Sequence, residues 1–443
     1  MKEKNAYNLP ITFKNILKFS VPTIVMTLFM SFYTMVDGLF VSNLIGTDAL
    51  SAINLTAPMI AFVTAISTML ATGGSAVIMI KMGEGKEKEA NEDFTFFIIV
   101  NIIVGIIMSI LGYMTMDLIF KRMSLSNNVF DYCHNYLSYY LIFTIPILLM
   151  NNFTIYMIAS GKSNLSMMCS IAGGILNIVL DYVFIKIFGF GIEAAAVATG
   201  LGYSVTAIVG AIIFSKKSNM IHFIKPAFRF GTLINAATNG SSEMATALVT
   251  GIVTMLFNWT MLKYVGEDGV AAITIIMYVL MFATSLYTGY SYGIAPMISY
   301  NFGSKDNEKL KKIVKKSLII IAVIAVSTLI LSISMTEKLV SIFTSPNNPV
   351  YDLAVQGNKI CSIALLIIGF NVFASSLFTA LSNGLISAII AFSRSFVFMV
   401  IAMLILPKLF GVIGIWFATP VAEVSAFCLA TFLFLKYKDE YKY

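Results

Sequence analysis

Residues 46–83 of this 443-residue chain, GTDALSAINLTAPMIAFVTAISTMLATGGSAVIMIKMG, contain the pattern on which the fold prediction rests. The apolar run near 47 to 80 exceeds the ~20 residues that a helix needs to cross a bilayer. Residues 266–303, GEDGVAAITIIMYVLMFATSLYTGYSYGIAPMISYNFG, repeat the stretch at an offset of 220, with ten identities in 38 positions. Because this offset is almost half the chain length, the repeat predicts two similar halves.

The same offset holds in two other places. Asn127-Asn128 recurs as Asn347-Asn348, and Ala198-Thr199 recurs as Ala418-Thr419. If each half has an even number of helices, the halves share one orientation and are related by a pseudo-two-fold axis along the membrane normal. Such an arrangement is typical of transporters.

Apolar residues make up 58% of the chain and charged residues 12%, against ~25% charged in soluble domains. Too few polar side chains remain to cover a soluble globule, so we expect an all-α polytopic membrane protein. Twelve apolar runs predict twelve transmembrane helices in two six-helix bundles. The runs lie near 16 to 43, 47 to 80, 94 to 120, 132 to 159, 165 to 187, 192 to 214, 240 to 262, 268 to 300, 313 to 334, 353 to 380, 384 to 407 and 412 to 435.

Twelve crossings place both chain ends on one side of the membrane. That side carries 21 of the 29 Lys and Arg residues, and the opposite side carries 7. Since cytoplasmic loops are enriched in Lys and Arg, we expect both termini in the cytoplasm. The expected domains are an N-terminal lobe at 1–215, a cytoplasmic linker at 216–239 and a C-terminal lobe at 240–443.

The sequence contains no motif of an enzyme or a metal centre. Its four Cys and two His residues lack metal-ligand spacing. Gly161-Lys162-Ser163 lacks the glycine five positions earlier that a phosphate-binding loop needs, since residue 156 is Tyr. We therefore expect no enzyme activity, no cofactor and no nucleic-acid partner, and the net charge of +7 is explained by membrane loops.

Of the 22 acidic residues, 18 lie in loops or at loop edges, which leaves Asp37, Asp181, Glu243 and Glu423 within apolar runs. An ionised side chain at bilayer depth costs at least ~2.5 kcal/mol, so each requires a partner, a proton or a water-filled cavity. Glu243 opens its helix, where the macrodipole favours an acid without any function. Glu423 and the intramembrane Arg394 either form a structural ion pair or contact substrate.

Asp37 and Asp181 belong to a group of polar residues at one depth, in the outer half of the first six helices. Asn177 and Asp181 are four residues apart and share a helix face. The helical rise brings Thr199 and Tyr136 to the same level, so the five side chains can form one site for a coupling cation and substrate. The oxygens of Na⁺ ligands are hard, and those offered here belong to Asp37, Asn177, Asp181 and Thr199. Two close carboxylates can instead share H⁺. The alternatives are that the two acids independently cap kinks or face water, and that Tyr136 and Thr199 only pack.

Several motifs resemble the multidrug and toxic compound extrusion (MATE) family over nearly the whole chain. They are Tyr33 to Gly46 with Asp48-Ala49-Leu50, Asn177 to Asp181 with Phe184-Ile185, Gly189 to Ile192 with Ala195 to Thr199, Ser299 to Gly303, and Gly411 to Trp416. Asn239 to Glu243 and Ser393-Arg394 are most similar to the bacterial branch typified by staphylococcal multidrug exporters.

The resemblance implies a bacterial inner-membrane antiporter that exports cationic, often aromatic drugs in exchange for H⁺ or Na⁺ by alternating access, with no partner subunit required. The 26 Met residues and the many aromatic residues suit a cavity for such bulky cations. Another branch of the family binds its ion with carboxylates deeper in helices seven and ten, where this chain has Asn258 and Asn371. The family's coupling and substrate residues fall here on Asp37, Asn177, Asp181, Thr199 and Tyr136.

The alternative function is a flippase for lipid-linked saccharides or other lipids, from the same superfamily. Anionic head groups would call for several Arg or Lys residues in the cavity. Arg394 is the one basic residue that the sequence places at depth in the membrane and away from the helix ends, so the sequence favours the drug exporter.

Overall fold

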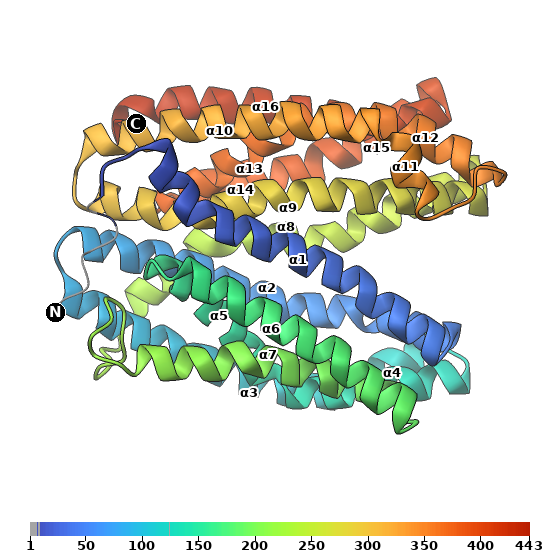
Figure 1. Cartoon of the computed structure of the whole chain (residues 1–443), viewed down its shortest axis with the longest axis horizontal. Helices are drawn as coiled ribbons and strands as arrows, with labels where there is room; N and C mark the ends of the chain where they lie inside the picture. Colours follow the sequence, from blue (N-terminus) through green and yellow to red (C-terminus); the bar gives the residue numbers. More distant parts are fainter. Residues whose placement is uncertain (1–6, 8, 124) are drawn as a thin grey trace.

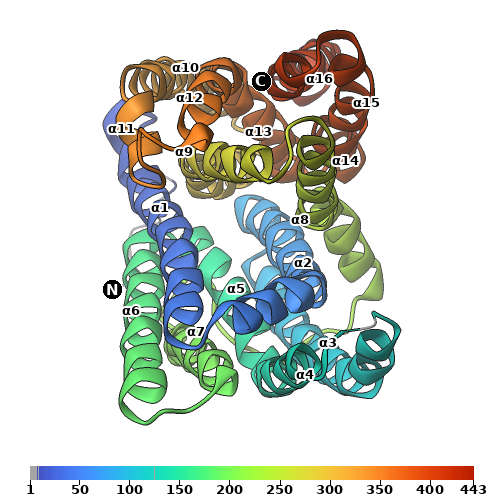
Figure 2. The same ribbon diagram turned by 90° about the vertical axis from the view of Figure 1, so that its right-hand side faces the viewer.

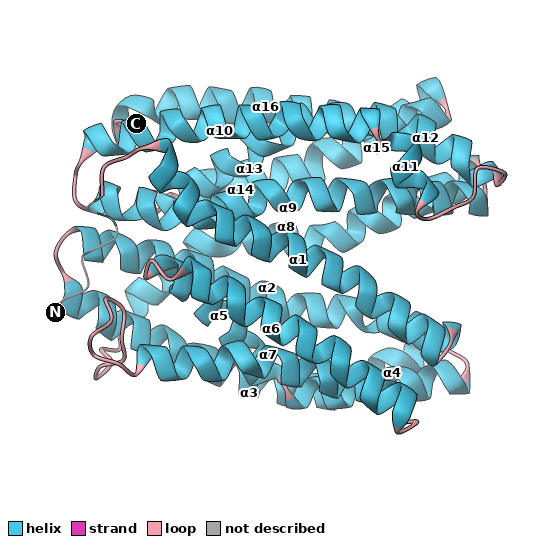
Figure 3. Ribbon diagram, viewed as in Figure 1, coloured by secondary structure: helices cyan, strands magenta, loops and turns pink. Residues whose placement is uncertain are grey.

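The computed structural model describes residue 7 and residues 9–123 and 125–443, with the side chains of 37–44, 47 and 50 outside the described part. These residues form an elongated bundle of helices (Figure 1) and contain no strand (Figure 3). The first half contains α1 (Phe13–Leu44), α2 (Thr47–Gly83), α3 (Glu87–Arg122), α4 (Asn127–Ile142), α5 (Thr144–Ala159), α6 (Ser163–Asp181), the π-helix η2 (Tyr182–Ile187) and α7 (Ile192–Phe214).

The second half is built in the same way. It contains α8 (Phe230–Tyr264), α9 (Glu267–Gly303), α10 (Asn307–Ser334), α11 (Thr336–Ser341), α12 (Pro349–Cys361), the 3₁₀-helix η3 (Ser362–Ala364), α13 (Leu365–Ala380), α14 (Gly384–Phe392), the π-helix η4 (Ser393–Val397), α15 (Phe398–Phe410) and α16 (Val412–Tyr441).

Eleven helical segments in the described residues are long and apolar enough to cross a membrane, and the bent pair α4 and α5 brings the number to as many as twelve. The prediction of an all-helical membrane protein is thus confirmed. The run predicted as one helix at 132 to 159 is instead two helices that meet at 57°. The chain breaks at Phe143 because Pro146, in the first turn of α5, has no N–H to donate to the turn before it.

The helices of the two halves form separate groups, with α1 and α2 facing α8 and α9 between them (Figure 2). The start of α1 and the end of α16 lie at the same end of the bundle, at the left in Figure 1. This end is called the termini end below, and the opposite one the far end. The helix α1 runs obliquely along the boundary and contacts both α6 of its own half and α9 of the other.

The helices α2 and α9 run in the same direction and meet at the termini end. A Cβ on Gly83, the last residue of α2, would lie 2.1 Å from the carbonyl oxygen of Tyr300, and a Cβ on Gly303, the last residue of α9, would lie 2.1 Å from that of Ile80. Gly83 and Gly303 are 220 positions apart, as are Ile80 and Tyr300. The contact therefore maps onto itself when the halves are exchanged, as a two-fold axis along the bundle requires.

A second glycine contact occurs once in each half. A Cβ on Gly73 of α2 would lie 1.9 Å from the carbonyl oxygen of Ala236 in α8. A Cβ on Gly293 of α9, the residue 220 positions later, would lie 2.7 Å from the Cα of Ser20 in α1. Because glycine has no side chain, the backbones of the two halves can touch at both places. Both contacts agree with the predicted parallel repeat.

The two halves pack tightly only toward the termini end. In α2, residues 70–79 are nearly all buried, whereas residues 57–62 are half-buried or exposed. In α9, residues 289–299 are mostly buried, whereas residues 277–284 are half-buried. The ribbons separate toward the far end in the same sense (Figure 1). The structure is therefore closed at the termini end.

The segment between the halves is bound to α3. The backbone N–H of His222 donates to the amide oxygen of Asn91 at 2.8 Å, and Arg229 donates to Asp93 at 3.0 Å. Asp93 is fully buried and also pairs with Lys81 of α2. Of the segment predicted as linker, 216–239, residues 230–239 belong to α8. The extended connection is accordingly shorter than the sequence suggested.

Candidate functional site

Two of the predicted site residues are in direct contact. The amide nitrogen of Asn177, in α6, donates a hydrogen bond of 3.1 Å to the hydroxyl of Thr199, in α7. Both side chains are buried. Gly173 and Gly202 make this contact possible, because a Cβ on either would lie within 2.6 Å of the other's carbonyl oxygen.

Asn177 has an acceptor to spare. Its amide oxygen is buried and has no hydrogen-bond partner among the described atoms. A buried amide oxygen without a donor costs ~1–3 kcal/mol, so such an atom calls for a ligand, a proton donor or water. This orphan acceptor is the feature of the site that points most directly to a bound cation.

Asp181 ends α6, one helical turn beyond Asn177, and is 1% exposed. The π-helix η2 begins at the next residue. Single π-turns inside membrane helices occur frequently at functional sites, because they redirect side chains and free backbone groups. Because Asn177 and Asp181 both belong to α6 and are four residues apart, they share a helix face, as their spacing predicted.

Asp37 lies in α1, but its carboxyl group is outside the described part of the chain. The backbone nevertheless locates the residue. A Cβ on Gly174 of α6 would lie 2.6 Å from the ring of Phe29 and 3.6 Å from that of Tyr33, both in α1. Since Asp37 follows Tyr33 by one turn and α1 also contacts η2, the α1 segment with Asp37 runs past the end of α6.

Tyr136 of α4 is buried in an apolar cluster with residues of η2 and α7. The cluster includes Ile185, Ile192 and Ala196. The centre of the Tyr136 ring lies 6.3 Å from that of the Tyr140 ring. The structure therefore places Tyr136 on the same side of the first half as the Asn177–Thr199 pair, but gives no hydrogen bond between them in the described residues.

The three weaker candidates come together in the second half. The guanidinium Nε of Arg394, in the π-helix η4, donates to both carboxylate oxygens of Glu423 in α16, at 2.8 and 3.1 Å. Asn371 of α13 donates to the same carboxylate at 2.7 Å and to the Glu423 carbonyl at 2.9 Å. Arg394 also interacts electrostatically with Glu243. The structure thus contains the ion pair between Arg394 and Glu423, and a contact of either residue with substrate stays a prediction.

The prediction that Glu243 opens its helix is wrong, because α8 begins at Phe230 and Glu243 lies well inside it. Glu243 instead lines a small cavity between the halves. The cavity has a volume of about 30 Å³, and its walls include Thr72, Ser75, Tyr292 and Ser299. This is room for one or two waters at ~10–15 Å³ each. The sequence did not predict the chain of hydroxyls beside it, in which Ser387 contacts Ser242 at 2.9 Å, Thr379 at 2.7 Å and Ser375 at 3.0 Å. The i, i+4 spacing of Ser375 and Thr379 was the only available signal.

A second buried polar group, in the first half, was also not predicted. Asn101 of α3 and Asn152 of α5 donate to each other at 3.2 and 2.9 Å, and Asn152 donates to Ser67 of α2 at 3.2 Å. Amide and hydroxyl pairs of this kind commonly hold membrane helices together. The mutual pairing makes this group structural.

The described part of the chain contains no cluster of three or more His, Cys, Asp or Glu residues that could hold a metal ion. A bound Na⁺ would therefore rely on the Asn177 amide oxygen, the Thr199 hydroxyl and the Asp181 carboxylate, which are hard oxygen ligands. An apolar pocket of about 440 Å³ lies between α2, α3, α4 and α8, with Met59, Met108 and Tyr140 in its walls. A pocket of this volume can hold a drug-sized ligand.

The model of the MatE family matches residues 22–183 and again residues 244–405, once in each half. This chain belongs to the MatE family. The double match agrees with the repeat at an offset of 220. The resemblance to the MATE family drawn from the sequence is thereby confirmed.

Curated relatives of this MatE protein are named multidrug export protein MepA. That of Staphylococcus haemolyticus is 24% identical over 423 residues, covering 95% of this chain and 93% of the relative. That of Staphylococcus aureus strain MRSA252 is 24% identical over 428 residues, covering 96% of this chain and 94% of the relative.

Solved structures of MATE transporters share the fold. One in complex with MaL6 has a TM-score of 0.94 at 21% identity and covers 99% of this chain and 98% of its own. Another, described as the outward-facing conformation of a multidrug resistance MATE family transporter, has a TM-score of 0.91 at 21% identity, with 96% of both chains covered.

Proposed function

We propose that this MatE protein is a secondary multidrug exporter that exchanges cationic, amphipathic drugs for H⁺ or Na⁺. The staphylococcal relatives, which it matches over almost their whole length, are named multidrug export proteins. The coupling residues in this proposal are Asp37, Asn177, Asp181 and Thr199, with Tyr136 beside them.

One observation carries the proposal: the buried amide oxygen of Asn177 has no hydrogen-bond partner among the described atoms, while the amide nitrogen binds the Thr199 hydroxyl and Asp181 lies one turn away. A carboxylate buried in a membrane helix, such as that of Asp181, is costly while it is ionised, and a cation offsets that cost. A small cation or a proton would supply that charge. The amide and hydroxyl would then complete the coordination of Na⁺, or hold the carboxyl group when it is protonated.

We propose that the protein works by alternating access, which a structure closed at one end supports. We propose that the termini face the cytoplasm of a bacterial inner membrane, from the excess of Lys and Arg on that side. The closed termini end then makes this state outward-facing. Drug and coupling cation would compete, and the difference in their affinities for the two states would shift the population between them. The lobes that rock are those expected at 1–215 and 240–443.

A lipid or saccharide flippase is the less well supported alternative. Its anionic substrate would need free positive charge within the membrane. Arg394 does not provide this charge, because Glu423 binds it through two hydrogen bonds and Asn371 completes the pair.

The proposed function is tested by growing a pump-deficient bacterial host that expresses this chain on a panel of cationic dyes and antibiotics. We expect increased resistance to several structurally unrelated cations, and none for an Asp181→Asn variant expressed at the same level. Resistance to no member of the panel, with the protein present in the membrane, would refute multidrug export.

A further inference from the structure

A basic groove opens at the termini end of the bundle, between the segment that leads into α1 and the first turns of α10. Its volume is about 680 Å³. Four lysines of α10 and apolar residues at the start of the chain form its walls, among them Lys309, Lys312, Lys315, Lys316, Ile11 and Phe13. The ammonium nitrogen of Lys316 lies 4.2 Å from the centre of the Phe13 ring, so the two sides of the groove are in contact.

The lysines gather on one face of α10. Lys309, Lys312 and Lys316 are spaced i, i+3 and i+7, while Leu310 and Val314 on the other face are buried. Like charges at such spacings repel one another and weaken the helix. The arrangement is therefore unfavourable unless an anion offsets it.

The protein itself offsets one of the four charges. Asp306 pairs with Lys309 at 3.0 Å, and the backbone N–H of Lys309 lowers the pKa of that carboxyl group, which keeps it ionised. Among the described residues, Lys312, Lys315 and Lys316 have no carboxylate within salt-bridge distance. Three positive charges thus remain around the groove.

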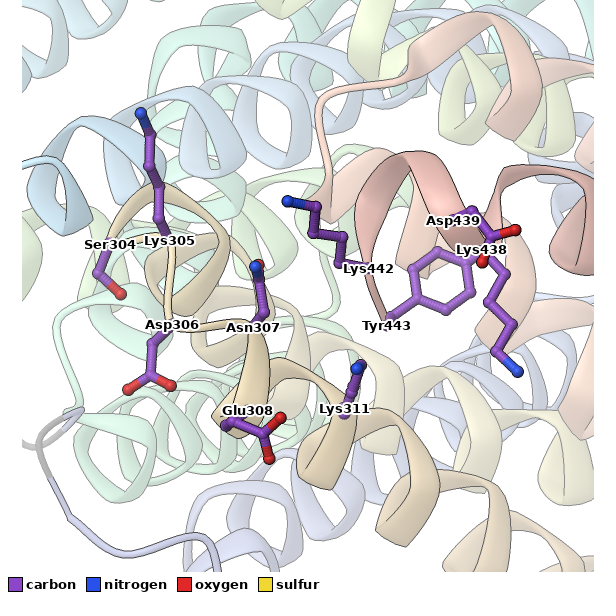
Figure 4. A pocket seen from close by; sticks show the side chains of 10 residues that line it. All are labelled: Ser304, Lys305, Asp306, Asn307, Glu308, Lys311, Lys438, Asp439, Lys442 and Tyr443. Carbon is purple, nitrogen blue, oxygen red and sulfur yellow. The ribbon is translucent and has the colours of Figure 1, made fainter.

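A neighbouring hollow at the same end differs from the groove in the charges of the residues that line it. It is formed by the loop between α9 and α10 and by the end of α16, with a volume of about 770 Å³. Figure 4 shows its lysines interspersed with the acids Asp306, Glu308 and Asp439. Among the described residues, no acid lines the basic groove. Of the two hollows, the groove is the one suited to an anion.

An apolar track continues from the groove along the membrane surface of the bundle. On α10, Ile319, Val323, Val326 and Ile330 are exposed at spacings of four, three and four residues, which places them on one face. On α1, exposed apolar side chains recur every four residues, at Phe13, Leu17, Val21 and Val25. The groove therefore joins a positively charged mouth to two stripes that face lipid tails.

We propose that this groove binds one anionic phospholipid from the leaflet on the termini side, with its phosphate held by Lys312, Lys315 and Lys316. Its acyl chains lie along the exposed stripes of α1 and α10. Basic pockets at the ends of membrane helices bind such head groups. Because α1 belongs to the first half and α10 to the second, the lipid bridges the halves at the end where they are closed.

The test is a titration of the full-length protein, stripped of lipid in a neutral detergent, with dioleoyl phosphatidylglycerol. Native mass spectrometry counts the bound lipid, and the thermal unfolding midpoint follows its effect. We expect one tightly bound lipid and a raised midpoint. Lys312→Gln/Lys315→Gln/Lys316→Gln should weaken binding by tenfold or more, since each lysine near a membrane surface contributes about a fivefold change in affinity for anionic lipid.

Three controls identify the ligand and its position. The corresponding triple Arg variant should bind as wild type, and so should Lys216→Gln/Lys217→Gln/Lys225→Gln, which removes the same charge from the same end outside the groove. Dioleoyl phosphatidylcholine and inorganic phosphate should each give no comparable effect, because one lacks net charge and the other lacks chains. Wild-type affinity in the triple Gln variant of the groove, equal binding of phosphatidylcholine, or equal protection by phosphate would each overturn the proposal.

Discussion

Gly240 of α8 lies directly against the backbone of Met69 in α2, and a Cβ on Gly240 would be 1.9 Å from the Met69 carbonyl oxygen. This contact joins the two halves at their closed end. Any state in which the termini end opens must separate the two helices here. In the proposed alternating-access cycle, the contact between Gly240 and Met69 is therefore made in only one of the two states.

Replacing this glycine should bias the cycle. Gly240→Val forces a side chain into the contact and should destabilise the closed termini end by about 1–3 kcal/mol. We expect loss of drug export and faster labelling of a cysteine at Ser299, which is buried in the cavity between the halves. The labelling is measured with a membrane-impermeant maleimide in a background in which the exposed Cys428 is replaced by Ser.

The matched control is Gly251→Val, in the same helix, where a Cβ would meet no atom within 4 Å. It should leave labelling and export unchanged. If Gly240→Val labels at the wild-type rate, the glycine contact does not govern closure.

The orientation of the chain is the second prediction. Both termini should face the cytoplasm, because the loops on their side hold most of the Lys and Arg residues. A fluorescent reporter that matures only in the cytoplasm should be active when fused after Tyr443, and a phosphatase that needs export should be inactive there. The opposite pattern would make the closed termini end external and the state shown here inward-facing.

The third prediction concerns the two acids of the first half. Asp37→Asn and Asp181→Asn should each abolish export while leaving expression intact, since Asn keeps the volume but cannot carry the charge. Resistance in cells and the amount of protein in the membrane measure the two effects. Full resistance in both variants would make these acids structural.

The fourth prediction separates an ion pair from a substrate contact in the second half. Arg394→Met should lower stability by about 3–5 kcal/mol, because it leaves the Glu423 carboxylate buried without its partner. Adding Glu423→Gln should restore most of that loss, and Asn371 can still donate to the new side chain. Thermal unfolding of the singles and the double measures the coupling. Export that recovers together with stability in the double variant indicates a structural pair, and stability without export indicates a substrate role.

The sequence predicted what hydrophobicity and the repeat determine. Apolar runs located the membrane helices, and the fixed offset of 220 predicted the equivalence of Gly83 and Gly303, which the structure packs against Tyr300 and Ile80 respectively. The i, i+4 spacing of Asn177 and Asp181 predicted their common face. Their proximity to Thr199, however, also depends on the close approach of two backbones at Gly173 and Gly202, which spacing along a single helix cannot show.

Helix ends were predicted less well, because local hydrogen bonds and not hydrophobicity determine them. The helix expected from residue 313 begins at Asn307, where the Asp306 side chain accepts from the Lys309 N–H and caps the first turn. The π-helices at Tyr182–Ile187 and Ser393–Val397 also carry no compositional signal. One π-helix follows Asp181 and the other contains Arg394. The backbone segments that the sequence could not predict therefore lie at candidate functional residues.

The fifth prediction concerns the identity of the coupling ion, because the groups of the site suit both Na⁺ and H⁺. The Asn177 amide oxygen and the Thr199 hydroxyl suit Na⁺, whereas a buried carboxylate with a like charge nearby can take up H⁺. If both ions use the same atoms, either gradient should drive dye efflux from proteoliposomes, and Asp181→Asn should abolish both. Thr199→Val should impair the Na⁺-driven reaction more, because it removes an ion ligand but no titratable group, and Thr199→Ser should restore it. Efflux that persists in Asp181→Asn under one gradient alone would mean that the two ions bind at separate sites, and the shared-site mechanism would then be wrong.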